Sequence, residues 1–242
     1  MGCLAAHGAF VGSIFVRSLA YNEAMPDEKA LREQLVRICR QLYAKELIVA
    51  TDGNVSVRLG PDRFLTTPSG VCKGHLEPDM PVVVDTQGRK LEGTLKPSSE
   101  FGMHLAIYHV RPDVEAIVHA HPPTATAFSV AGVSLEPPIL TEVVITLGAI
   151  PTTPYATPGT PEVGDAVRSA AATHEAFILD HHGAVTLGRN LDEAYYRMET
   201  VEQTAKVHLM AHQLGGIRPL APAQVEALDE IRRKLMAIEP DK

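Results

Sequence analysis

The sequence has few of the residues that build disulfide-linked or aromatic-rich folds. Its 242 residues include no tryptophan, and aromatic residues make up only 5%. The cysteines, Cys3, Cys39 and Cys72, are odd in number and form no C-x-x-C pair. This pattern argues against a disulfide framework and indicates a protein of the reducing cytoplasm. No apolar run reaches the length of a transmembrane helix.

Positive charge is also scarce. Lysine and arginine number 22 against 29 aspartates and glutamates, which gives a formal net charge of −7. Nucleic-acid binding requires a basic stripe, and binding to an anionic membrane surface requires a basic cluster. The sequence has neither, so we expect no nucleic-acid partner and no membrane partner.

The remaining composition is that of an ordinary globular protein, with 45% hydrophobic and 21% charged residues. Residues 1–24 contain a short apolar run without preceding positive charge, which only weakly supports a signal peptide. We expect them to form an N-terminal extension outside the core. No repeat, low-complexity tract or linker interrupts the rest, so residues 25–242 are predicted to form a single domain.

The hydrophobic pattern predicts helices and strands in alternation. Helices are predicted over residues 27–46, 98–110, 124–131, 161–173 and 191–212. Strands are predicted over residues 54–59, 63–66, 81–85, 115–121, 143–147, 177–180 and 184–187. The first two strands should form a hairpin, and Ser98 or Ser99 should cap the helix that ends near residue 110.

The most informative motif is His119-Ala-His121, which ends the apolar run that begins at Glu115. Side chains two apart on a strand point to the same face, so both imidazoles should project side by side. Neutral imidazole is the commonest protein ligand for zinc and similar ions. Burying two such rings without a metal would leave ring nitrogens in need of partners. From spacing alone, a metal site and a hydrogen-bonded histidine pair both remain open.

Two further residues could complete a metal site. Glu100 lies in Lys96-Pro-Ser-Ser-Glu100, and His182 lies in Asp180-His-His-Gly183. Catalytic zinc sites usually take three protein ligands and leave one position for water or substrate. The three histidines supply three nitrogens, and a carboxylate such as that of Glu100 can supply an oxygen. Neighbours on an extended segment point to opposite faces, so only one of His181 and His182 should coordinate. The other histidines with helical neighbours, His104, His109 and His208, are interpreted as packing or surface residues.

Three segments rich in small polar residues form a second group, at residues 51–56, 67–70 and 97–99. Glycine lets the backbone approach an anion, and hydroxyl and amide groups donate to phosphate oxygens. Each segment alone is also typical of an ordinary turn or helix cap. Because Ser98 and Ser99 directly precede Glu100, the three together would place an anion pocket beside the metal.

With these motifs assembled, the chain resembles the class II aldolase/adducin-head family over about residues 27–215. The family includes L-fuculose-1-phosphate aldolase and L-ribulose-5-phosphate 4-epimerase. Six motifs occur in the family's order. They are Gly53-Asn-Val-Ser-Val-Arg58, Thr67-Pro-Ser-Gly70, Pro97-Ser-Ser-Glu100, Val118-His-Ala-His121, Pro154-Tyr-Ala-Thr157 followed by Gly159-Thr160, and His182-Gly183.

The resemblance implies an α/β fold with three layers, in which helices flank a central mixed, largely antiparallel sheet. It implies a homotetramer with the site at a subunit interface and one Zn²⁺ per subunit, with Mn²⁺ or Co²⁺ as alternatives. The implied metal ligands are Glu100, His119, His121 and His182. The implied phosphate-binding residues are Gly53, Asn54, Ser69, Gly70, Ser98 and Ser99.

The resemblance also implies a reaction, the cleavage or formation of a carbon–carbon bond of a ketose phosphate. The family's aldolases pass through an enediolate of dihydroxyacetone phosphate, whose negative charge zinc stabilises as a Lewis acid. Glu100 would be the base, moving a proton at the enediol carbon once substrate displaces it from the metal. Glutamate at this position favours an aldolase over the epimerases, which carry an aspartate there.

Two departures from the aldolases leave the substrate open. Their tyrosine that transfers a proton at the aldehyde oxygen is matched here by Leu140, and nothing aromatic follows Tyr196 to match a second, C-terminal tyrosine. Glu142 is a possible substitute or simply an exposed carboxylate, and Tyr155 matches a family tyrosine without an assigned role. The alternative is a metal-dependent decarboxylase of an oxo-acid or aromatic acid, in which Lys73 or Lys96 would hold a carboxylate.

A third hypothesis is a non-catalytic, adducin-like head that binds protein partners. Such heads lack the zinc ligands, whereas all four matching positions are filled here. The prediction is therefore a lyase of carbohydrate metabolism that acts on a small sugar phosphate or related carboxylate.

Overall fold

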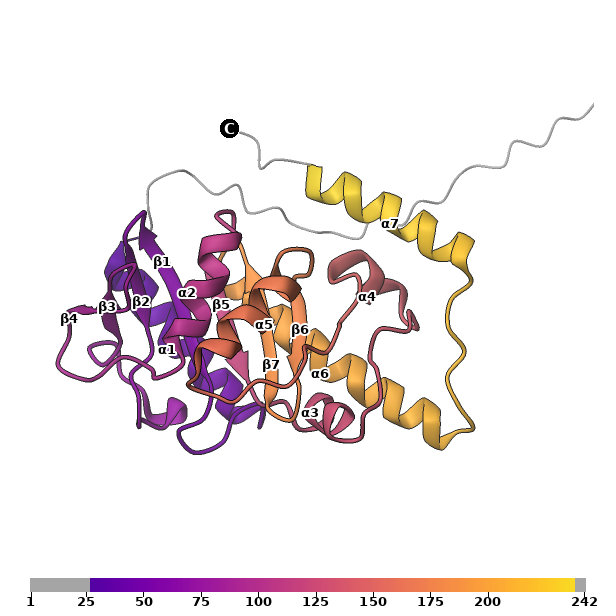
Figure 1. Cartoon of the computed structure of the whole chain (residues 1–242), viewed down its shortest axis with the longest axis horizontal. Helices are drawn as coiled ribbons and strands as arrows, with labels where there is room; N and C mark the ends of the chain where they lie inside the picture. Colours follow the sequence, from indigo (N-terminus) through magenta and orange to yellow (C-terminus); the bar gives the residue numbers. More distant parts are fainter. Residues whose placement is uncertain (1–26, 238–242) are drawn as a thin grey trace, which may run out of the picture.

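The computed structural model describes residues 27–237, and its core is a single sheet of seven strands within that range (Figure 1). The strands are β1 (Asn54–Gly60), β2 (Arg63–Thr66), β3 (Val82–Val84), β4 (Lys90–Glu92), β5 (Ala116–Ala120), β6 (Ala176–Leu179) and β7 (Gly183–Gly188). Their order is β4-β3-β2-β1-β5-β7-β6, and every neighbouring pair is antiparallel. An isolated parallel bridge joins Thr152 to Ile178. The extension predicted for residues 1–24 lies outside the described residues.

Helices connect and cover these strands. They are α1 (Glu28–Ala44), α2 (Phe101–Val110), α3 (Pro123–Val130), α4 (Thr141–Thr146), α5 (Pro161–Ala171), α6 (Leu191–Gln213), α7 (Pro222–Ala237) and the short 3₁₀ turn η1 (Lys73–His75). Asp27 and Asn190 cap α1 and α6, because each side chain accepts a hydrogen bond from the first turn. Within residues 27–237, no helix has the length and apolar character needed to cross a bilayer.

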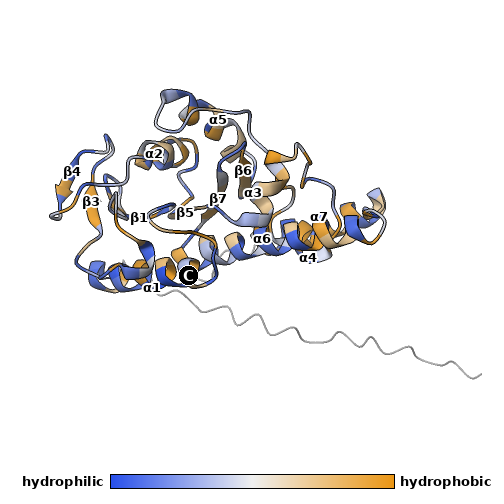
Figure 2. Ribbon diagram, turned by 90° about the horizontal axis from the view of Figure 1, so that it is seen from below, coloured by the Kyte–Doolittle hydropathy of each residue, from blue (hydrophilic) through white to orange (hydrophobic). Residues whose placement is uncertain are grey.

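The sheet lies between two layers of helices, with α2 and α5 on one face and α1 and α6 on the other (Figure 2). The alternation along β5 explains the two cores. Ala116 and Val118 pack with α1 and α6, whereas Ile117 packs with α2 and α5. His119 and His121 follow Ile117 at intervals of two, which places them on the α2 face. The predicted three-layer α/β fold with a largely antiparallel sheet is thus confirmed.

The structure corrects the strand predicted over residues 143–147, which is the helix α4. Val143, Val144 and Leu147 are all buried, a spacing that matches one face of a helix. A short apolar run of β-branched residues cannot be assigned to strand or helix by pattern alone, and tertiary packing decides here. The predicted serine cap is also imprecise: Glu100 is the N-cap residue of α2, and Ser98 Oγ accepts a hydrogen bond from its backbone N–H at 3.3 Å.

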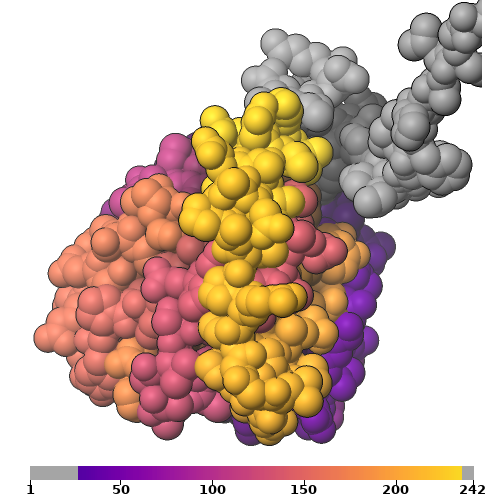
Figure 3. All heavy atoms as spheres, turned by 90° about the vertical axis from the view of Figure 1, so that its right-hand side faces the viewer, coloured from indigo at the N-terminus to yellow at the C-terminus, as the bar shows by residue number. Residues whose placement is uncertain are grey.

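The sequence analysis missed α7, which lies against α4 on the outside of the molecule (Figure 3). Its half-buried residues, Val225, Leu228, Asp229 and Arg232, repeat at helical spacing. Polar members of this stripe weaken its hydrophobic pattern, which explains why the helix escaped the prediction.

Candidate metal centre and anion pocket

The centre of the site is His119, which the sheet buries completely. β5 lies between β1 and β7, and the Nδ1 of His119 is 3.0 Å from the backbone oxygen of Ala184 on β7. A carbonyl oxygen only accepts hydrogen bonds, so Nδ1 must carry the proton. The neutral ring therefore presents an unprotonated Nε2 to the interior of the site. A backbone partner that fixes the tautomer in this way is typical of a metal-binding histidine.

His182 reaches the same place from the turn between β6 and β7. Gly183, the first residue of β7, packs so closely that a Cβ atom there would lie 2.7 Å from Cδ2 of His121. Only glycine lets this turn approach the histidine strand. His181 has a φ of 55°, is exposed, and contacts its neighbour Asp180 instead. The structure thus brings His182, and not His181, to the predicted partners.

The three imidazoles converge. Their ring centroids are 4.8 to 5.0 Å apart, and Nε2 of His121 is 3.2 Å from Nε2 of His119. Glu100 completes the group, with one carboxylate oxygen 3.5 Å from Nε2 of His119 and the other 3.4 Å from Nε2 of His182. A tetrahedral zinc ion with bonds of about 2.0–2.1 Å has ligand atoms about 3.3–3.4 Å apart. The donor types and these three distances fit a zinc-like divalent cation, and the ligand atoms of the three histidines all lie within 4.8 Å of one another.

The protonation states suit the same role. Burial lowers the pKa of His119 far below its usual value, and the neighbouring rings of His121 and His182 lower it further. Burial and the charge of His182 also lower the pKa of His121, against the opposing effect of Asp52. Both rings are therefore neutral near neutral pH, the state in which imidazole binds metal.

Asp52, which the sequence analysis did not single out, stands behind His121. Its Oδ2 lies 3.6 Å from Nδ1 of His121, on the side of the ring away from His119. A carboxylate behind a ligand histidine raises the ring's basicity and orients it. The position of Asp52 in the sequence, immediately before the Gly53-Asn54 motif, was the signal that could have identified it.

Glu100 is held at the start of α2 by Asn54, whose Nδ2 donates to Oε2 at 2.9 Å. Burial raises the pKa of Glu100, while His182 and the Asn54 hydrogen bond act in the opposite direction. A carboxyl group whose pKa is moved toward neutrality is well suited to proton transfer. Asn54 therefore has a role besides the predicted contact with phosphate.

Behind Glu100, α2 is fixed to β1 by buried polar contacts that the sequence analysis also missed. Ser56 Oγ lies 2.7 Å from Nδ1 of His104 and 2.8 Å from the hydroxyl of Tyr108. The guanidinium of Arg58 lies over the Tyr108 ring, 4.9 Å from its centroid. Positions 54, 56 and 58 are two apart and therefore share one face of the strand, and positions 100, 104 and 108 are four apart and share one face of the helix. That matched spacing was the signal in the sequence.

The three candidate anion-binding segments lie side by side. Thr67 N–H donates to the Val55 carbonyl at 3.0 Å, which joins the first segment to the second. Ser98 N–H donates to the Thr67 carbonyl at 3.1 Å, and a bridge pairs Pro68 with Pro97. Ser69, Gly70 and Ser99 are exposed, Ser98 is half-buried, and Gly53 and Asn54 are buried. The predicted phosphate residues are therefore gathered next to Glu100.

Among the other candidates, Tyr155 lies beside the turn that carries His182, with its ring centroid 6.5 Å from that of His181. Leu140 is half-buried against the core, Glu142 is exposed on α4, and Tyr155 is 62% exposed. His104 and His208 are buried and His109 is exposed, as predicted for packing and surface residues.

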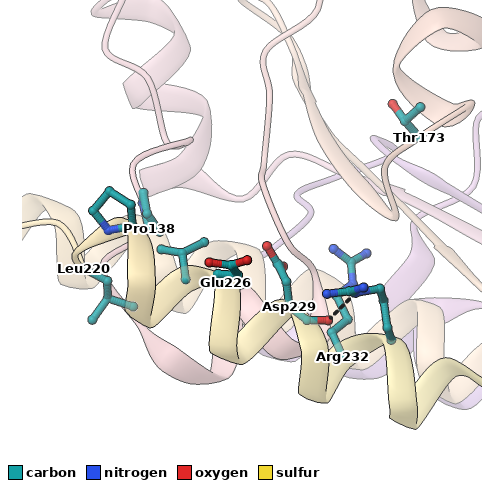
Figure 4. A pocket seen from close by; sticks show the side chains of 9 residues that line it. Pro138, Thr173, Leu220, Glu226, Asp229 and Arg232 are labelled. Atoms are coloured by element: carbon teal, nitrogen blue, oxygen red, sulfur yellow. Dashed lines mark hydrogen bonds between the residues drawn. The ribbon is translucent and has the colours of Figure 1, made fainter.

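A separate groove of about 780 Å³ lies along α7 (Figure 4). Its lining includes Pro138 and Leu220 together with Glu226, Asp229 and Arg232. None of the clustered histidines borders it, so the candidate chemistry lies elsewhere in the described part of the chain.

Comparison with known proteins identifies the family. The sequence profile of the Class II Aldolase and Adducin N-terminal domain matches residues 33–209. The 3-oxo-tetronate 4-phosphate decarboxylase of Escherichia coli strain K12 is 34% identical over 209 residues, or 85% of this chain and 96% of that protein. The L-fuculose phosphate aldolase of Methanococcus vannielii is 38% identical over 177 residues, or 73% of this chain and 94% of that protein.

A solved structure gives the same result. YgbL from Escherichia coli superposes with a TM-score of 0.78 at 34% identity, covering 83% of this chain and 98% of that chain. The chain therefore belongs to the class II aldolase and adducin family and is an enzyme of that superfamily.

Proposed function

We propose that the protein is a metal-dependent carbon–carbon lyase that decarboxylates a phosphorylated 3-oxo acid. The observation that carries the proposal is the position of Glu100, between three convergent imidazoles and the serine segment at residues 98–99. The same group of residues could thus bind a phosphate and present a carboxyl group to the reacting carbons. The named decarboxylase relatives act on 3-oxo-tetronate 4-phosphate, a substrate with this combination of groups.

The bond changes in such a reaction are simple. The bond between C1 and C2 of the 3-oxo acid breaks, carbon dioxide leaves, and the electron pair remains with C2 and the adjacent carbonyl. Protonation at C2 then gives dihydroxyacetone phosphate from 3-oxo-tetronate 4-phosphate. A divalent cation held by His119, His121, His182 and Glu100 would supply Lewis-acid stabilisation of the negative charge on the substrate oxygens.

The chain's own residues supply the remaining steps. Asn54 orients the Glu100 carboxyl through its amide, and Glu100 delivers the proton to C2. Segments 67–70 and 97–99 would hold the phosphate, so that remote binding energy positions the reacting carbons. Decarboxylation requires no proton transfer at an aldehyde oxygen, which accords with the hydrocarbon side chain of Leu140 at the position of the aldolase tyrosine.

The second candidate is the predicted ketose-phosphate aldolase. Glu100 favours it over a 4-epimerase, and the L-fuculose phosphate aldolase of Methanococcus vannielii is the specific relative that supports it. Cleavage of such a ketose phosphate leaves the same electron pair next to the same carbonyl of dihydroxyacetone phosphate. The two reactions therefore make the same demands on Glu100 and the imidazoles. They differ in the group that departs and in the proton transfer at the aldehyde oxygen, which only the aldolase reaction requires.

We also propose Zn²⁺ as the resident metal, with Mn²⁺ or Co²⁺ as alternatives, and a homotetrameric assembly. The fit of ligand spacing to a zinc sphere supports the metal. Exposed apolar side chains at the end of α6, namely Leu209, Met210 and Leu214, support association with further copies. Metal analysis by mass spectrometry and light scattering of the purified protein test these two statements.

A direct assay tests the function. The metal-loaded protein is given 3-oxo-tetronate 4-phosphate or L-fuculose 1-phosphate, and dihydroxyacetone phosphate is measured by enzymatic coupling to NADH oxidation. We expect dihydroxyacetone phosphate and carbon dioxide from the oxo acid, and loss of both after the metal is removed with a chelator. Turnover of the ketose phosphate alone would favour the aldolase, and no product from either substrate would contradict both.

A further inference from the structure

Lys73, the first residue of η1, is a buried lysine, and burying an ammonium group costs free energy. Its side chain is only 2% exposed, although an ammonium group is strongly hydrated and lysine is almost never buried without a charged partner. Its Nζ donates to the carbonyl oxygens of Thr51 at 2.7 Å and Val71 at 3.0 Å. Among residues 27–237, these are its hydrogen-bond acceptors, and no carboxylate of that range forms an ion pair with it. The third N–H of the ammonium is therefore left over.

The two carbonyls that Lys73 contacts belong to different parts of the anion pocket. Thr51 opens the segment at residues 51–56, and Val71 directly follows the segment at residues 67–70. The third segment is attached to the second through the Ser98–Thr67 hydrogen bond. Lys73 thus joins the first two segments directly, and the third is attached to the second at Thr67.

The charge of Lys73 acts on the same site. Burial is the main influence on this ammonium and lowers its pKa, while Cys39, Asp52, Cys72 and Glu100, in that order, raise it. Both carboxylates belong to the candidate metal centre, so the ammonium and that centre are electrostatic neighbours. If Lys73 only braced two loops, an uncharged donor would do so at a smaller desolvation cost.

We propose that Lys73 is the buried cation of the phosphate pocket, joining two of its segments through Thr51 and Val71 and favouring a phosphate dianion with its unpaired charge. This inference rests on the proposed function, because it assumes that the natural substrate carries a phosphate. It assigns Lys73 a positioning and electrostatic role, in place of the direct carboxylate contact considered from the sequence. The side chain's burial and its two carbonyl partners are the reasons for that change.

Binding of inorganic phosphate tests the inference without any turnover. The ligand stabilises the folded protein by mass action, so the rise in Tm with increasing phosphate reports its affinity. We compare the wild type with Lys73→Met, which keeps the length of the side chain and removes its charge. The control is Lys90→Met, because Lys90 also donates to a backbone carbonyl, that of Leu95 at 3.1 Å, but is exposed.

We expect Lys73→Met to bind phosphate at least about tenfold more weakly, the change that corresponds to 1.4 kcal/mol. The Tm without phosphate is the reference for each variant, because the substitution removes the desolvation cost of the ammonium and also leaves the Thr51 and Val71 carbonyls without their donor. Lys90→Met should bind phosphate like the wild type. Lys73→Arg, which keeps the charge, should retain more of the affinity than Lys73→Met.

Three results would overturn the inference. One is unchanged phosphate affinity in Lys73→Met, and another is a wild type that phosphate does not stabilise. The third is a Lys73→Met protein that unfolds while Lys73→Gln, which keeps an uncharged donor, folds and binds phosphate normally. Lys73 would then only hold the two loops together, and its charge would have no role. Phosphate binding that depends on Lys73 in a protein without lyase activity would instead refute only the proposed function.

Discussion

Replacing Glu100 by glutamine separates proton transfer from the architecture of the site. The substitution keeps the size of the side chain, and the glutamine oxygen can still accept the hydrogen bond that Asn54 donates at 2.9 Å. Because burial raises the pKa of Glu100, the ionised carboxylate already carries a desolvation cost that the amide avoids. We therefore expect the free energy of unfolding of the metal-free protein to change by less than about 1 kcal/mol.

Activity should respond differently. A positioned general acid or base contributes about 10²- to 10⁴-fold to a rate, or roughly 3–5 kcal/mol of barrier, and glutamine cannot replace it. The measurement is kcat for dihydroxyacetone phosphate formation with saturating metal, so that a weakened metal site does not imitate lost chemistry. Glu77→Gln is the matched control, since Glu77 is exposed and its carboxylate forms a surface ion pair with Arg40. If kcat of Glu100→Gln stays within tenfold of the wild type, Glu100 is not the proton-transfer group.

Three further predictions concern pH, packing and metal. Burial lowers the pKa of His104 to about 3, so between that value and its unfolded value near 6.5 the unfolded chain binds more protons and stability falls as the pH falls. His104→Leu should remove up to ~1.4 kcal/mol per pH unit of that slope in urea unfolding at several pH values. Gly53→Ala should destabilise by more than ~2 kcal/mol, because its φ is 67° and a Cβ would lie 2.8 Å from the His119 carbonyl oxygen. Gly70→Ala should cost only about 1 kcal/mol, since its φ is similar but its surroundings are open. Chelation should lower the Tm of the wild type but not that of His182→Ala.

Each of these has an outcome that would count against it. A pH–stability slope that is identical in wild type and His104→Leu would mean that the buried ring does not set it. If the two glycine substitutions lowered the free energy of unfolding equally, the close approach of β5 to Gly53 would not be the reason for the loss. A Tm of His182→Ala that still falls on chelation would mean that the metal does not depend on this imidazole.

Much of this site could be predicted because its ligands lie on or next to regular elements. The β-branched run before His119 makes a strand, and the period of two along that strand sets both imidazoles on one face. The helix over residues 27–46 and the hairpin of β1 and β2 also follow their patterns closely. The placement of His182 beside them required the family resemblance, since one sequence does not reveal which distant turns meet.

Other features depend on tertiary packing and were beyond the sequence. Residues 143–147 have strand-like composition, and only the burial of one helical face makes them α4. From the sequence, Lys73 is interpreted as a possible ligand-binding lysine. In the structure its partners are two backbone carbonyls, which no sequence pattern predicts. The fold decides such cases because a hydrogen bond between distant segments has no local signature.

The position of the reactive carboxyl group follows from the register of α2 on β1. A helix turns by about 100° per residue and a strand alternates at every residue, so only one alignment pairs Asn54 with Glu100 and Ser56 with His104 at once. Asn54 then joins the two halves of the site. One N–H of its amide donates to Glu100, and in the proposed reaction the second would donate to the phosphate. Phosphate binding and the orientation of the proton donor would then depend on the same side chain, which would give a remote group a direct physical route to the reacting carbon.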